Sequence, residues 1–185
     1  MKFEASMCLA CNGKRSQKFD DAYVRYSRYV WQNMDSLWRR DHINMAEVFG
    51  ASWPVDTVHL ARYFAKHAAC SFVDSGFKTP QSIIDFLDEA TDRLSDMHMV
   101  LYKDQGLRRY RRTLKRVGVE GGGIHIEPAA GILSRSRKCL TSYSSAYALG
   151  FIGVKYYWKD GSSPSDSFYL HQKAPIHRRD RIPEI

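Results

Sequence analysis

The sequence contains little cysteine and no long hydrophobic run. Four cysteines among 185 residues are too few for a disulfide framework, so a reducing compartment is expected. The longest apolar stretch, residues 146–154, is broken by two glycines and falls short of the ~18 residues that a membrane span needs. The first residues lack the charged-then-apolar order of a signal peptide. These absences argue against secreted and membrane-spanning classes and predict a cytoplasmic protein without a membrane partner.

Positive charge is what the sequence has in excess, and it is unevenly distributed. The formal net charge is +8. Residues 1–100 carry 12 Lys/Arg and 13 Asp/Glu, whereas residues 101–185 carry 16 and 7, so the whole excess lies in the second half. Such asymmetry indicates a surface that faces a polyanion, usually nucleic acid, because neutralised phosphates release counterions. A basic protein with no special partner is the alternative.

Hydrophobic spacing predicts three helices in the first half. The first covers residues 19–40, where apolar residues recur every three or four positions. A second helix follows Trp53-Pro54 and runs to about residue 74. A third opens at Thr79-Pro80, which reads as an N-cap followed by proline at the first helical position. The apolar stripe of the first helix consists of Phe19, Tyr23, Tyr26, Val30, Met34 and Leu37.

The second half has a different pattern, which predicts strands and one basic helix. A strand is expected at residues 97–102 and a helix at 107–117. The remainder is rich in Ile, Tyr and Val, with turns between its apolar segments, and predicts strands near 124–133, 140–148, 152–158 and 168–171. The predicted architecture is α+β: an N-terminal knuckle and three helices, then a small antiparallel sheet with one basic helix. We expect one domain over residues 1–185, with a helical part at 1–92 and a sheet part at 93–185.

The basic helix is the main candidate for binding. An apolar stripe of Leu107, Tyr110, Leu114 and Val117 keeps helical spacing. Six cations lie between these residues. Repulsion between like charges at this spacing destabilises the helix unless a polyanion or an acidic surface lies opposite. An unpartnered solvated face is the alternative. The candidate nucleic-acid-binding residues on this helix are Arg108, Arg109, Arg111, Arg112, Lys115 and Arg116.

Further cations and aromatic residues extend this candidate surface. Arg135, Arg137 and Lys138 form a second cluster between strands, and Lys14 and Arg15 are secondary candidates. Residues 177–181 form a third basic cluster, expected to be a mobile tail. Aromatic side chains on a sheet beside Lys or Arg can stack on bases, although we expect two of these, Tyr147 and Tyr157, to pack in the core. The aromatic residues in question are Tyr143, Tyr147, Tyr156, Tyr157 and Trp158.

A Cys-x-x-Cys pair, Cys8 and Cys11, is a candidate half of a zinc site. Two thiolates at this spacing can ligate one face of a tetrahedral zinc, and His42, His67 or Cys70 could complete the ligand set. The alternative is a relic half-site that holds no metal. A redox pair is disfavoured because the βαβ context is missing. Zinc is therefore an expected cofactor only if further ligands come from elsewhere in the chain.

The stretch that contains this pair resembles the second half of the finger of HNH-type endonucleases. In that family a knuckle of the form Cys-x-x-Cys-Asn-x-x-Arg-Ser-Gln-x-Phe-Asp-x-Ala-Tyr leads into a long helix. Residues 61–70, followed by Asp74-Ser75-Gly76 and Pro80, are similar to the next helix of the same proteins. The matching knuckle residues are Cys8, Cys11, Asn12, Arg15, Ser16, Gln17, Phe19, Asp20, Ala22 and Tyr23.

The sequence departs from the family pattern before Cys8, and this departure changes the function that we expect. The resemblance implies an upstream hairpin that supplies the first zinc cysteines and the histidine that deprotonates the attacking water, yet only seven residues precede Cys8. Metal and base are both needed to hydrolyse a phosphodiester by this route. We therefore expect a non-catalytic nucleic-acid-binding protein derived from such a nuclease. The alternatives are a phage or mobile-element inhibitor or accessory protein that binds a nucleoprotein complex and, more weakly, a metal-dependent nuclease with a rebuilt site.

Other catalytic patterns are weak. His125 and Glu127 fall on one face of a predicted strand and could act as a base and the residue that orients it, but such pairs are usually structural. The glycine run at residues 121–123 lacks the Lys-Ser/Thr of a phosphate-binding P-loop. No catalytic residue is assigned from the sequence.

Overall fold

The helical layer follows the hydrophobic periodicity of the sequence. The computed structural model describes residues 11–119, 123–134, 139–162 and 166–182. Helices α1 (Gln17–Leu37), α3 (Trp53–Asp74) and α4 (Gln81–Leu87) confirm the three predicted helices. The buried side of α1 recurs at three- and four-residue spacing, which places one apolar stripe against the core. That stripe consists of Phe19, Ala22, Tyr26, Val30, Met34 and Leu37.

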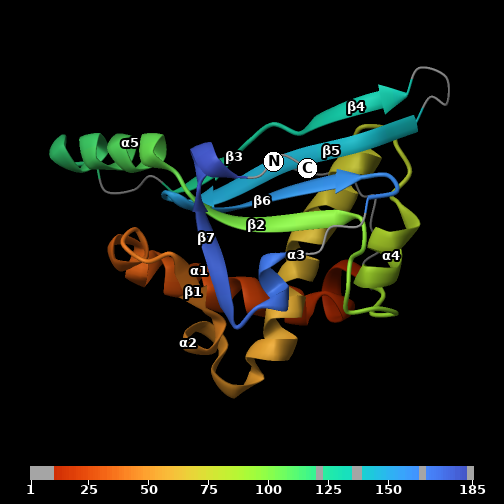
Figure 1. Cartoon of the computed structure of the whole chain (residues 1–185), viewed down its shortest axis with the longest axis horizontal. Coiled ribbons are helices and arrows are strands. Elements are labelled where there is room, and N and C mark those ends of the chain that lie inside the picture. The colour runs from red at the N-terminus through yellow and green to blue at the C-terminus, as the bar shows by residue number, and fades with distance from the viewer. Residues whose placement is uncertain (1–10, 120–122, 135–138, 163–165, 183–185) are drawn as a thin grey trace.

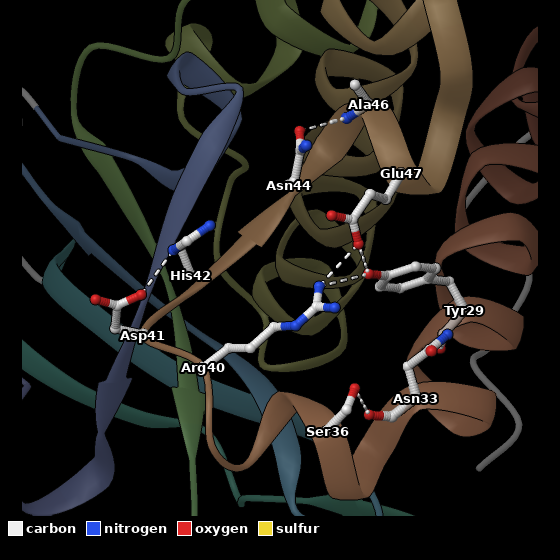
Figure 2. Close-up of polar contacts among 9 residues, drawn as sticks. All are labelled: Tyr29, Asn33, Ser36, Arg40, Asp41, His42, Asn44, Ala46 and Glu47. Atoms are coloured by element: carbon white, nitrogen blue, oxygen red, sulfur yellow. Dashed lines mark hydrogen bonds and ion pairs between the residues drawn. The ribbon is translucent and has the colours of Figure 1, made fainter.

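Four short elements surround these helices and were not anticipated. A π-helical turn, η1 (Cys11–Arg15), precedes α1. Strand β1 (His42–Asn44), helix α2 (Met45–Phe49) and the 3-10 turn η2 (Gly50–Ser52) connect α1 to α3. The side-chain oxygen of Asn44 accepts a hydrogen bond from the backbone N–H of Ala46 at 3.2 Å and caps α2 (Figure 2). These elements are too short to show a periodic pattern.

Within the described residues the sheet has seven strands in the order β1-β7-β2-β6-β5-β3, with β4 also paired to β5. Strands β2 (Met97–Lys103), β6 (Ile152–Lys159) and β5 (Cys139–Leu149) form its antiparallel centre. Strands β3 (Ile124–Ile126) and β4 (Ala130–Ser134) pair with β5, and β7 (Lys173–Arg178) pairs in parallel with β2. The predicted α+β class is confirmed, and the predicted antiparallel sheet is mostly antiparallel, with one parallel pair between β2 and β7.

The C-terminal region differs from the prediction. Residues 168–171 were expected to form a strand, but Phe168–Leu170 form a 3-10 turn, η3, whose Phe168 and Tyr169 are buried. The basic cluster at 177–181 was expected to be a mobile tail. Its first part belongs to β7, which lies between β1 and β2, and Arg179–Arg181 form another 3-10 turn, η4. His177 and Arg178 lie opposite Tyr102 and Lys103 of β2, so the first part of the cluster belongs to the sheet.

The core lies between one face of the sheet and the helices. Helices α1, α3 and α4 lie on the same side of the sheet, whereas α5 (Gln105–Arg116) projects beyond one end of it (Figure 1). Phe72 of α3 makes an edge-to-face contact with Trp158 of β6, and Phe64 packs near Tyr156. Helical and sheet residues thus share one apolar cluster. Among the described residues, no helix is long and apolar enough to cross a membrane.

Candidate nucleic-acid interface

Helix α5 starts at a well-defined cap. The Asp104 carboxylate accepts a hydrogen bond from the backbone N–H of Leu107 at 2.9 Å, and Arg179 donates to the same carboxylate at 2.6 Å. Burial alone would raise the pKa of Asp104, but the hydrogen bonds from Arg179 and from the Leu107 and Gly106 N–H groups outweigh burial and lower the pKa. The start of the basic helix is therefore fixed by an ionised, mostly buried carboxylate.

Two of the six predicted cations of α5 are held by tryptophans, Trp31 in α1 and Trp38 directly after it. The guanidinium carbon of Arg108 lies 4.3 Å from the ring centre of Trp38, and that of Arg111 lies 4.4 Å from the ring centre of Trp31. These are cation–π contacts, in which the negative face of the ring attracts the cation. Burial lowers the pKa of Arg108, and Arg112 lowers it further. Arg108 and Arg111 thus attach α5 to α1.

The other four predicted cations of α5 face solvent. Within the described part of the chain, none of the four makes an ion pair, and several are three or four residues apart, where like charges repel. The half-buried side of the helix is formed by Leu107, Arg108, Arg111 and Leu114, so the predicted apolar stripe is wrong at Tyr110 and Val117, which are 52% and 68% exposed. The exposed cations are Arg109, Arg112, Lys115 and Arg116.

The segment that carries Trp38 is itself fixed. The Lys103 ammonium donates hydrogen bonds to the carbonyl oxygens of Trp38 and Arg40, at 3.0 and 2.6 Å. Arg40 and Tyr29 both donate to the carboxylate of Glu47, at 2.8 and 2.5 Å (Figure 2). Burial and the hydrogen bond to Glu47 raise the pKa of Tyr29 to about 12, while the same hydrogen bond lowers the pKa of Glu47. This network holds the loop that follows α1 and therefore the position of the Trp38 ring.

The remaining predicted cations do not join this surface. Lys14 and Arg15 are exposed, but they precede α1, whereas Trp31 and Trp38 lie at its far end, and 21 residues of helix span about 30 Å. Arg15 also lies 3.5 Å from the Asp88 carboxylate. The predicted cluster of Arg135, Arg137 and Lys138 lies outside the described residues.

The C-terminal cations, in contrast, lie next to α5. Arg179 contacts the carboxylates of both Asp104 and Glu127. Glu127 is therefore engaged by an arginine, and the ring of its predicted partner His125 lies 6.1 Å from the ring of Tyr110 on α5. The structure thus brings Glu127, through Arg179, close to the cap of α5 and His125 close to the middle of that helix.

A second polar surface lies on the sheet around Tyr157, one of the aromatic residues that the sequence marks as candidates for stacking on bases. Tyr147 is buried as predicted, but Tyr157 is only half-buried and lies on the face of β6 opposite the core, so its predicted core position is wrong. A hollow of about 270 Å³ opens beside it, with His98 and Ser144 among the lining residues. Alternation along residues 155–159, with Lys at both ends and Tyr in the middle, is the signal that could have indicated this surface.

The candidate zinc ligands are only partly described. Cys8 lies outside the described residues, as does the side chain of Cys11. Lys66 of α3 donates a hydrogen bond to Ser16, so the neighbouring His67 and Cys70 lie on the part of α3 that packs against the start of α1. His42 lies on β1, beyond the other end of α1, and contacts Asp41 (Figure 2). Among the side chains that the structure describes, no group of three or more His, Cys, Asp or Glu could hold a metal ion.

Comparison with known proteins gave no match: no protein-family model, no curated protein and no solved structure matches the chain. The resemblance to HNH-type endonucleases therefore depends on the motif residues themselves. Two of these now have structural roles: Tyr23 stacks on Tyr63 with ring centres 4.1 Å apart, and Arg62 is buried.

Proposed function

We propose that this chain is a non-catalytic nucleic-acid-binding protein whose helix α5 lies against a phosphate backbone. The observation that carries the proposal is the division of cations on α5. Arg108 and Arg111 are held by tryptophans, whereas the four exposed cations defined above have no acidic partner among the described residues. A rigidly attached row of unpaired cations is suited to neutralising phosphates.

The energetics favour a polyanionic partner over bare solvent. Like charges three or four residues apart cost about 0.2–0.5 kcal/mol each in an isolated helix. A nucleic acid would offset this repulsion and release condensed counterions, which is the main source of non-specific affinity. The neighbouring turn η4 adds Arg181, which is exposed and makes no ion pair within the described residues.

The resemblance to HNH-type endonucleases supports the same proposal. Proteins of that family act on nucleic acid, so a protein derived from them would be expected to contact phosphates. We propose this lineage for the residues that match the knuckle and the helix at residues 61–70.

One observation favours a second candidate, an accessory or inhibitory protein that docks on a nucleoprotein complex. Apolar side chains are exposed at and beyond the end of α5: Val117 and Val119 are 68% and 47% exposed, near the exposed Tyr110. Apolar and cationic groups on one surface fit a protein that itself binds nucleic acid, because protein interfaces enrich aromatic and Arg residues. In this case the isolated chain would not bind free nucleic acid.

The test is direct binding to labelled single-stranded DNA, duplex DNA and RNA, measured by fluorescence anisotropy at about 50 and 200 mM salt. The variant is Arg109→Glu/Arg112→Glu. The control is Lys78→Glu/Arg93→Glu, which makes the same change in net charge at two exposed residues flanking α4. We expect the first variant to lose more than about tenfold in affinity and about two units of salt slope, and the control to bind like wild type. Equal losses in both variants, or no binding by wild type at the lower salt, would refute the proposal.

A further inference from the structure

Strand β6 presents two different faces. Tyr156 and Trp158 are 4% and 5% exposed and point into the core. Successive side chains on a strand point to opposite sides, so Lys155, Tyr157 and Lys159 lie on the outer face of the sheet. The Lys155 ammonium lies 5.0 Å from the ring centre of Tyr157. A half-buried aromatic ring is thus flanked by two cations.

The neighbouring strands form a hollow around this ring. In the strand register, Tyr157 lies opposite His98 of β2 on one side and Ser144 of β5 on the other. These three residues, with Ser142 and Lys159, line the hollow of about 270 Å³. Within the described residues, the hydroxyls of Ser142 and Ser144 have no hydrogen-bond partner. The hollow therefore offers an aromatic surface together with unused hydrogen-bonding groups.

The charges on this face are complementary to phosphate. Lys155 and Lys159 make no ion pair within the described part of the chain. Strands β2, β5 and β6 carry no carboxylate. Of the acids around them, Asp160 lies in the turn after β6, Asp166 pairs with His171, and Asp96, just before β2, accepts a hydrogen bond from the Trp158 indole. A ligand that combines a flat ring with negative charge fits both properties.

We propose that the outer face of the sheet binds single-stranded nucleic acid, with one base stacked on Tyr157 in the hollow and the flanking phosphates on Lys155 and Lys159. The proposal rests on the proposed function and specifies its substrate. Bases in a duplex are already stacked and paired, so their faces cannot reach a ring on a sheet, whereas an unpaired base can. Single strands therefore gain a contact that duplexes lack.

The basic helix and this face lie within reach of one strand. Tyr157 is five residues along β6 from Ile152, at the end of the sheet where α5 projects, which is about 17 Å. The C-terminal segment lies between them, because Ile182 packs against Tyr102, Ala146 and Ala148 on the outer face. Arg181 precedes Ile182 and is exposed. A single strand that crosses from α5 to Tyr157 thus passes a further cation.

Substitution of the ring tests the stacking contact. We compare Tyr157→Phe, which keeps the ring, with Tyr157→Leu, which keeps apolar bulk without it, on labelled single-stranded DNA, single-stranded RNA and duplex DNA. Stacking on one base predicts that Tyr157→Leu loses about 5- to 100-fold in affinity for single strands and less than about twofold for duplex. Tyr157→Phe should bind like wild type. Equal binding by the Leu and Phe variants would overturn the proposal, and the DNA and RNA arms show which strand is preferred.

Photocrosslinking gives an independent readout that does not require a variant to fold. A single strand carrying a photoreactive pyrimidine is irradiated with the wild-type protein, and the crosslinked peptide is identified by mass spectrometry. We expect the crosslink at Tyr157 or its lining neighbour His98. Crosslinks confined to α5, with salt-dependent binding intact, would overturn the stacking site and leave the proposed function standing. If the protein bound none of the probes, both the stacking site and the proposed function would be contradicted.

Discussion

The guanidinium of Arg108 lies over the ring of Trp38, 4.3 Å from its centre, and joins the basic helix to the end of α1. The residue after Arg108 faces solvent. Adjacent arginines in the same basic run therefore have different roles: one attaches the helix and the other is available to a partner.

Removing the anchoring arginine should affect stability more than binding. We expect Arg108→Ala to lower the free energy of unfolding by about 1 kcal/mol, the size of a partly desolvated cation–π contact. The matched variant Arg109→Ala should change it by less than about 0.5 kcal/mol. Nucleic-acid binding should be weakened more by Arg109→Ala than by Arg108→Ala, and Arg109→Ala should reduce the salt slope by about one unit. Urea unfolding measures the stability of both variants, and fluorescence anisotropy on the same preparations measures their binding. If the two variants lost the same stability and the same salt slope, the division of roles would be contradicted.

Asp104 should contribute stability that depends on pH. Its folded pKa is lowered, so its contribution is present above the ordinary aspartate value of about 3.9 and disappears as pH falls through the folded pKa. We expect Asp104→Ala to cost about 1–2 kcal/mol at pH 7, because a helix cap and a partner of Arg179 are lost. The variant should also lose less stability than wild type on acidification. Asp21→Ala, at an exposed position, is the control; an equal loss there would argue against the cap.

Arg62 should be essential to the helical layer. It is 2% exposed and donates hydrogen bonds to the carbonyl oxygens of Phe86 and Thr91 and to the Asp92 carboxylate, at 2.7, 2.9 and 2.8 Å. Arg62→Lys cannot reach three acceptors with one ammonium, so we expect a loss of about 2 kcal/mol or more, and a larger loss for Arg62→Ala. Thermal and urea unfolding measure this. Arg93→Ala, at an exposed arginine nearby, should be close to neutral, and a neutral Arg62→Ala would refute the role.

Gly153 should tolerate no side chain. A Cβ atom there would lie 2.5 Å from the Tyr102 ring and 2.7 Å from the carbonyl oxygen of Tyr147. Gly153→Ala should therefore destabilise the sheet by about 1–3 kcal/mol through overpacking. Gly13→Ala, where a Cβ meets nothing within 4 Å, is the matched control. A chemical-denaturation midpoint for Gly153→Ala equal to wild type would show that the outer cluster around Tyr102 is loosely packed.

The long helices and central strands were predictable because each buries one continuous face. The spacing along α1 and the alternation along β6 carry this information locally. Strand β7 was missed because Pro175 interrupts it and its ends are charged, which argues against an interior strand. Its position depends on pairing with β1 and β2, far away in the sequence.

The sequence predicted the cluster of cations at the candidate site, but not which of these cations are exposed. The sequence identifies six cations near residues 107–117, but it does not show that Trp31 and Trp38, more than 60 residues earlier, hold two of them. The helical periodicity placed Tyr110 inside and Arg111 outside, and the structure reverses both. Packing partners distant in sequence decided which residues are available to a ligand.

The most direct test of the central claim is the salt dependence of nucleic-acid binding for wild type and for a variant with all four exposed cations of α5, Arg109, Arg112, Lys115 and Arg116, changed to Gln. Each phosphate contact contributes about 0.7–0.9 to the slope of log affinity against log salt. We expect the slope of the variant to be smaller by about three, and its melting temperature to equal or slightly exceed that of wild type because the repulsion among the four cations is removed. An unchanged slope would show that α5 does not contact phosphate and would contradict the account.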